Sequence, residues 1–127
     1  MTQSDYEIYL LQQLNGFLAE LNHKTQELNE DHPFALWLQR TSAVAKAGPA
    51  DYGTLRQQVL ALFTHYTDMA PLFPRDILYF LGGECLHFMP DEEITAYQAL
   101  DEMRFEAESQ QKRFDWEQSK QSLKKLQ

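Results

Sequence analysis

Apolar residues recur at steps of three and four along most of the chain, whereas runs that alternate apolar and polar residues are nearly absent. The first spacing places side chains on one face of an α-helix, and the second is typical of a β-strand. The clearest stripe lies near the N-terminus and is interrupted by Lys24. Its members are Leu10, Leu14, Phe17, Leu21 and Leu28. The pattern therefore predicts an all-α fold.

Capping signals divide the chain into five predicted helices. Ser4 and Glu7 match a capping box, in which each side chain satisfies a free backbone amide of the first turn. Pro33 is favoured in a first turn, Asp31 is the expected cap before it, and Gly48–Pro49 should end that helix. The predicted helices cover about residues 5–29, 33–47, 52–67, 75–89 and 91–124, with a loop at 69–74.

Two interpretations fit the Gly82–Gly83 pair. The apolar phase continues through the pair, which favours one helix over 75–89 whose missing side chains let a neighbouring helix approach closely. The residues that carry this phase are Ile77, Leu78, Leu81, Cys85 and Phe88. The competing interpretation ends the helix at Gly82, because glycine readily forms a left-handed cap.

The last predicted helix is apolar on one face in its first half and poor in apolar residues in its second half. At ~1.5 Å per residue it would reach about 50 Å, which is longer than a small bundle. Residues 111–127 are therefore expected to project, to dock on a partner or to fray. The predicted architecture is a single domain over 1–127, a compact bundle of about five helices with a long C-terminal helix.

The sparse apolar residues of that second half are candidates for partner binding. Phe114 and Trp116 either cover one end of the bundle or anchor another protein, since aromatic residues dominate interface energetics. With Leu123 they form the predicted partner-binding set, and the partner is another protein or a second copy of this chain.

The single cysteine lies in the segment FLGGECLHFMPDEE, close to other residues that could carry chemistry. Cys85, His87 and Glu84 belong to residue types that bind zinc, but positions two apart point to different faces of a helix. Cys85 is therefore expected to be a small buried core residue. The acids at 91–93 are explained as the start of a helix, where negative charge meets the positive end of the dipole. We expect no catalytic residue, metal ion or cofactor.

Length and cysteine content place the chain among single-domain proteins of a reducing compartment. It has 127 residues, enough for one hydrophobic core, and its one cysteine cannot form an internal disulfide. Its N-terminus lacks the basic and apolar parts of a signal peptide, and no apolar stretch approaches the ~20 residues that span a bilayer. These features predict a soluble cytoplasmic protein.

The formal net charge of −8 is unevenly distributed. Residues 1–32 carry six acids and one Lys (net −5), residues 91–108 carry seven acids and one Arg (net −6), and residues 112–127 carry two acids and five bases (net +3). An acidic chain repels phosphate backbones, so direct binding to nucleic acid is not expected.

The sequence predicts a small protein-protein interaction or regulatory protein that binds through its C-terminal helix. One alternative is a small enzyme or a ligand-binding or metal-binding protein that uses the region of Cys85 and His87. The other is an acidic mimic of nucleic acid, which the two acidic segments permit.

Overall fold

The structure is a computed structural model that describes the backbone of residues 3–46 and 51–126, and the side chains of 5–46 and 51–122. Every regular element in these ranges is helical, which confirms the predicted all-α class. No helix within them is long and apolar enough to cross a bilayer. The elements are α1 (Gln3–Lys24), α2 (Pro33–Lys46), α3 (Tyr52–His65), η1 (Thr67–Leu72), α4 (Arg75–Leu81), η2 (Gly83–Phe88), α5 (Asp91–Ser109) and α6 (Trp116–Leu126), where η marks a 3₁₀-helix.

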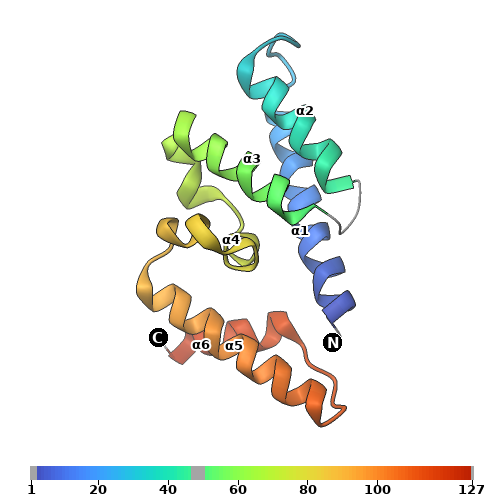
Figure 1. Ribbon diagram of the computed structural model, residues 1–127, viewed down its shortest axis with the longest axis vertical. Coiled ribbons are helices and arrows are strands. Elements are labelled where there is room, and N and C mark those ends of the chain that lie inside the picture. Colours follow the sequence, from blue (N-terminus) through green and yellow to red (C-terminus); the bar gives the residue numbers. More distant parts are fainter. Residues whose placement is uncertain (1–2, 47–50, 127) are drawn as a thin grey trace.

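The helices form an elongated arrangement in which α1 spans much of the length (Figure 1). α2 and α3 pack at the upper end in this view, α4 lies in the middle, and α5 and α6 form the lower end. α1 contacts both α2 and α4, and its first turns reach α6, where Tyr6 packs on Trp116 with ring centroids 4.7 Å apart. α1 therefore connects the two ends of the molecule.

Four of the predicted helix starts are confirmed, those of α2, α3, α4 and α5, with one change of cap. The carboxylate of Asp51 accepts a hydrogen bond from the Thr54 amide at 3.0 Å, as expected of an N-cap. α2 starts at Pro33, but the side chain that satisfies its first turn is His32, whose Nδ1 accepts from the Phe34 amide at 3.0 Å. The ring nitrogen thus takes the role that was predicted for Asp31.

Other predicted ends differ from the structure. α1 already includes Ser4, so the predicted capping box is not its start, and it ends at Lys24 instead of near residue 29. At its end, the Thr25 hydroxyl and amide both donate to the Leu21 carbonyl, at 2.7 and 3.0 Å. Residues 67–72, partly expected to be a loop, form η1. The predicted end of the second helix at Gly48–Pro49 lies outside the described residues.

The preferred prediction of one helix over 75–89 is wrong: the helix ends at Gly82, as in the competing interpretation, although the ψ of −154° at Gly82 lies outside the left-handed helical region expected of the cap. Both glycines have positive φ, +65° at Gly82 and +56° at Gly83, a region that residues with a Cβ rarely adopt. α4 ends at Leu81, and the chain restarts as η2, with the Cys85 amide bonded to the Gly82 carbonyl at 3.1 Å. Arg56 of α3 donates to the freed Leu81 carbonyl at 3.3 Å.

The predicted long C-terminal helix is also wrong, because the chain reverses after Ser109. Gln111 has φ +56°, its amide bonds to the Glu108 carbonyl at 3.1 Å, and the Lys112 amide bonds to the Ala107 carbonyl at 2.8 Å. This pair of bonds is the Schellman motif that ends a helix, here without the usual glycine. α6 then starts after Asp115, whose carboxylate accepts from the Gln118 amide at 3.0 Å.

Candidate functional site

Cys85 is buried, as predicted, and the residues beside it point elsewhere. Its side chain is 0% exposed, whereas Glu84 and His87 are exposed on the same 3₁₀-helix. Burial raises the pKa of the Cys85 thiol to about 11, so the thiol stays protonated and unreactive at neutral pH. Neither Cys85 nor His87 lines the two cavities described below. Within residues 3–46 and 51–126, no cluster of three His, Cys, Asp or Glu side chains could hold a metal ion.

Two of the three predicted partner-binding residues pack inside the chain itself. Phe114 is 8% exposed and Trp116 is 1% exposed, and the Trp116 ring lies against Tyr6 and Tyr97. The backbone of Leu123 lies in α6, and its side chain is outside the described residues. Phe114 and Trp116 thus have a packing role here, while their role in partner binding stays a prediction.

A pocket of about 360 Å³ opens between the first turns of α1, the end of α4, η2 and α5. We call it the aromatic pocket, because aromatic and aliphatic side chains form most of its wall. These are Tyr6, Tyr79, Phe80, Leu86, Ile94 and Phe105. Gln98, Asp101 and Arg104 of α5 supply the polar part. A mostly apolar concavity with a few polar groups is the usual form of a binding pocket.

Arg104 is the charged centre of this pocket and is only 3% exposed. Its guanidinium lies 3.5 Å from Asp101 Oδ1 and 3.2 Å from Glu108 Oε1, one turn to either side on α5. The guanidinium carbon also lies over the rings of Tyr6 and Phe105, 4.3 and 4.5 Å from their centroids. Ion pairs and ring contacts together offset the cost of burying the charge and fix the side chain in place.

The two tyrosines of the pocket keep their protons at neutral pH. Burial, followed by the nearby charge of Asp101, raises the pKa of Tyr6 far above its usual range. Burial and Asp101 also raise the pKa of Tyr79 to about 12. The Tyr6 hydroxyl is buried and finds no hydrogen-bond partner among the described residues. Buried hydroxyls normally have a partner, so Tyr6 is an exception among the buried groups of this fold.

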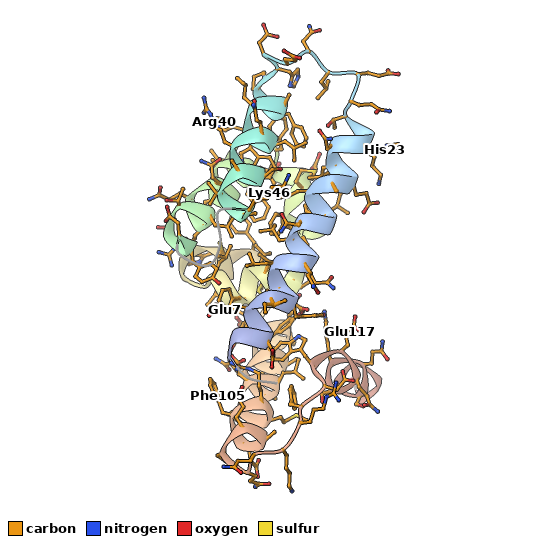
Figure 2. The ribbon with its side chains drawn as sticks, turned by 90° about the vertical axis from the view of Figure 1, so that its right-hand side faces the viewer. Glu7, His23, Arg40, Lys46, Phe105 and Glu117 are labelled. Carbon is orange, nitrogen blue, oxygen red and sulfur yellow. The ribbon has the colours of Figure 1, made fainter. Side chains whose placement is uncertain are left out.

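An exposed aromatic ring lies at the rim of the pocket. Phe105 is 56% exposed although Arg104 holds one face of its ring, and Figure 2 shows it beside the first turns of α1. Glu102 and Glu106 are exposed on the same helix, within the segment of net charge −6. The pocket therefore presents an aromatic ring on a helix of net negative charge.

A second polar centre joins four helices around Asp76 of α4, which is 4% exposed. Its Oδ1 accepts from Tyr97 at 2.6 Å and from the Lys120 ammonium at 2.8 Å, and its Oδ2 accepts from Tyr9 at 3.2 Å. We call these four residues the Asp76 cluster. They tie α1, α4, α5 and α6 together, and Lys120 compensates the buried carboxylate.

Sequence patterns revealed neither centre, because each is assembled from separate helices. In the sequence, Arg104 is the single basic residue of the acidic segment 91–108, and nothing marks it as buried. Asp76 has the position of an ordinary acidic residue in the first turn of a helix. One available signal was Asp115 followed three residues later by Gln118, a capping pattern that marks the start of α6. That start would have predicted a break before Trp116 in the long C-terminal helix.

A comparison with protein families found one match. The family model described as PA2817-like matches residues 1–127. Neither the curated proteins nor the solved structures contain a significant match to the chain.

Proposed function

The chain belongs to the PA2817-like family along its whole length, and for this member we propose a non-enzymatic function in binding another protein through the aromatic pocket. The observation that carries the proposal is Phe105, an exposed aromatic ring held by the buried Arg104 at the mouth of a concave apolar surface. Aromatic residues, including Phe, and Arg are enriched at protein interfaces. A side chain fixed before binding also loses little conformational entropy on association.

The proposed partner offers an apolar side chain flanked by basic residues. A volume of about 360 Å³ suits one or two side chains. The acids of α5 around the pocket attract positive charge, which speeds encounter and selects against acidic partners. The single buried, free thiol fits the reducing cytoplasm, where we propose that the protein acts.

This proposal places the binding surface on α1, α4, η2 and α5, with α6 as its support. Trp116 of α6 packs against Tyr6, which lines the pocket. The C-terminal helix then affects binding by positioning the pocket wall, in addition to any contact that its exposed face makes.

Peptide selection followed by matched substitutions tests the proposal. A library of displayed peptides is selected on the full chain, and the dissociation constants of enriched peptides are measured by fluorescence polarisation. Phe105→Ser should weaken binding by ~30-fold or more, the loss expected of an energetically dominant interface residue. Leu72→Ser is the matched control, because Leu72 is 68% exposed and lies outside the pocket.

The selected peptides should share an aromatic or aliphatic residue beside Lys or Arg, and Glu102→Gln with Glu106→Gln should reduce the salt dependence of their binding. Equal binding by the Phe105 and Leu72 variants would contradict the assignment of the surface. Sedimentation of the parent and of the same variants tests whether the partner is a second copy of the chain. In that case the parent should self-associate, and Phe105→Ser should abolish the self-association.

A further inference from the structure

A second, polar cavity of about 230 Å³ is lined by residues of α1, α4 and α6. In the view of Figure 2, its residue Glu117 and the Phe105 of the aromatic pocket appear on either side of the start of α1. We call this cavity the polar cleft; α1 contributes Tyr9 and Gln13 to it, α4 contributes Arg75 and Asp76, and α6 contributes Glu117 and Lys120. The residues on α1 are four apart and those on α6 are three apart, so each pair lies on one face of its helix. Two helical faces therefore meet across the cleft with polar side chains.

The positive group of the cleft is held in a fixed position. Lys120 donates one hydrogen bond to the buried Asp76 carboxylate at 2.8 Å, and its side chain is 23% exposed. An ammonium group has three donors, so two remain for another acceptor. Arg75 adds positive charge but uses its donors within the protein, on Glu93 and on the carbonyls of Ala70 and Phe88.

The negative group of the cleft is Glu117, which is exposed and lies on α6 toward the rest of the molecule (Figure 2). It lies one turn from Lys120, yet no ion pair joins these two among the described residues, because the ammonium is held by Asp76 instead. Opposite charges are thus kept apart at the edge of one small cavity. The amide of Gln13 from α1 lies at the same cavity.

We propose that the polar cleft binds a small zwitterion of the size of an α-amino acid. The carboxylate of the ligand would accept a hydrogen bond from the Lys120 ammonium, and the ammonium group of the ligand would donate one to the Glu117 carboxylate. The Gln13 amide would contact the polar groups of the ligand. A zwitterion satisfies both groups at once, whereas a simple anion leaves Glu117 without a partner and a simple cation leaves the two remaining donors of Lys120 unused. The volume lies below the ~300–1,000 Å³ of pockets for drug-sized molecules, which limits the ligand to a small one.

Nuclear magnetic resonance of the full chain tests this proposal independently of the aromatic pocket. The isotope-labelled protein is titrated with L-alanine, acetate and ethylamine at concentrations up to ~10 mM, below those at which osmolytes stabilise proteins non-specifically. L-Alanine should give saturable amide shifts at residues that line the cleft, and acetate and ethylamine should give none. Larger amino acids then define which side chains the cavity admits.

Two substitutions make the result specific to the cleft. Glu117→Gln removes the negative group from an exposed position, so the fold should persist while the dissociation constant for L-alanine rises about tenfold or more. Glu27→Gln is the matched control, because Glu27 is exposed in the turn after α1. The proposal is overturned by the absence of saturable shifts with every amino acid tried, by equal shifts with acetate, or by equal affinity of the Glu117 and Glu27 variants.

Discussion

At the scale of single residues, backbone conformation and burial decide what each side chain can do. Gly82 and Gly83 look like helix residues that permit close packing, but both have positive φ. Gly16 and Gly53 lie inside helices, and a Cβ added to either would meet no atom within 4 Å. The four glycines therefore fall into two classes that composition alone does not separate.

Alanine substitutions should reveal these two classes in the free energy of unfolding, measured with urea. Gly82→Ala and Gly83→Ala should each destabilise by ~1 kcal/mol or more, because alanine is strained at positive φ. At Gly83 the new Cβ would also meet Arg56 Nη1 at 3.2 Å. Gly16→Ala is the control and should stabilise by up to ~1 kcal/mol through helix propensity. Stabilisation at Gly82 or Gly83 would contradict the observed end of α4.

Cys85 should behave as a structural residue. Cys85→Ser places a hydroxyl where a fully buried thiol packs, and should lower the free energy of unfolding by ~1–3 kcal/mol. Cys85→Ala adds no polar group, so it should lower the free energy of unfolding by less than Cys85→Ser does. Thiol labelling of the folded protein near pH 7 should be slow, and rapid labelling would show that Cys85 is accessible.

At the scale of elements, the last helices owe their arrangement to contacts that join distant parts of the chain. The Schellman motif ends α5, and Phe114 and Trp116 then pack α6 back onto the core. Lys120 fixes the same helix through Asp76. α6 thus completes the core instead of extending α5 into solvent.

Removal of α6 should therefore destabilise the whole chain. Truncation after Gln110 deletes two core aromatics and the cation that compensates Asp76, so its cost should exceed the ~3–5 kcal/mol expected for Trp116→Ala alone. Circular dichroism during thermal and urea unfolding measures both variants. Gln118→Ala, at an exposed position of α6, should stay within ~0.5 kcal/mol of the parent. A truncated chain as stable as the parent would place α6 outside the cooperative core.

The Asp76 cluster should be sensitive to the loss of its carboxylate. Asp76→Ala leaves Lys120 without its partner and removes the acceptor for two tyrosine hydroxyls. Because Lys120 is partly exposed, Asp76→Ala should lower the free energy of unfolding by less than the ~3–5 kcal/mol lost when a fully buried ion pair is broken. A loss under ~1 kcal/mol in urea unfolding would show that the cluster does not tie the helices together.

At the scale of the whole molecule, charge and protonation set the conditions under which the protein is stable. Three of the seven acids in residues 91–108 form ion pairs, Glu93 with Arg75 and both Asp101 and Glu108 with Arg104. Part of the negative charge therefore supports the fold, while the interpretation of the acidic segments as a mimic of nucleic acid stays a prediction. Burial meanwhile raises the pKa of Cys85 to about 11 and of Tyr52 and Tyr79 to about 12.

The molecule should lose stability at alkaline pH. A raised pKa in the folded state means that folding favours the protonated group, so its contribution is complete below the unfolded pKa and is lost as pH rises through the folded pKa. For Cys85 this window runs from 9.0 to about 11. The free energy of unfolding, measured across it, should fall less steeply for Cys85→Ala than for the parent. If the free energy of unfolding of the parent and of Cys85→Ala fell equally with pH, the Cys85 thiol would have the same pKa in the folded and unfolded states.

The sequence by itself determined the helical class, the starts of α2, α3, α4 and α5, and the burial of Cys85, because these follow from local periodicity, capping and polarity. Only the tertiary structure decided where a helix ends without a Gly or Pro to stop it, as α5 does at Gln111. The tertiary structure likewise decided which glycines adopt positive φ. It also decided the two sites. The aromatic pocket and the polar cleft each combine residues from helices far apart in the chain, and the pairing of those helices depends on packing energies that no local pattern encodes.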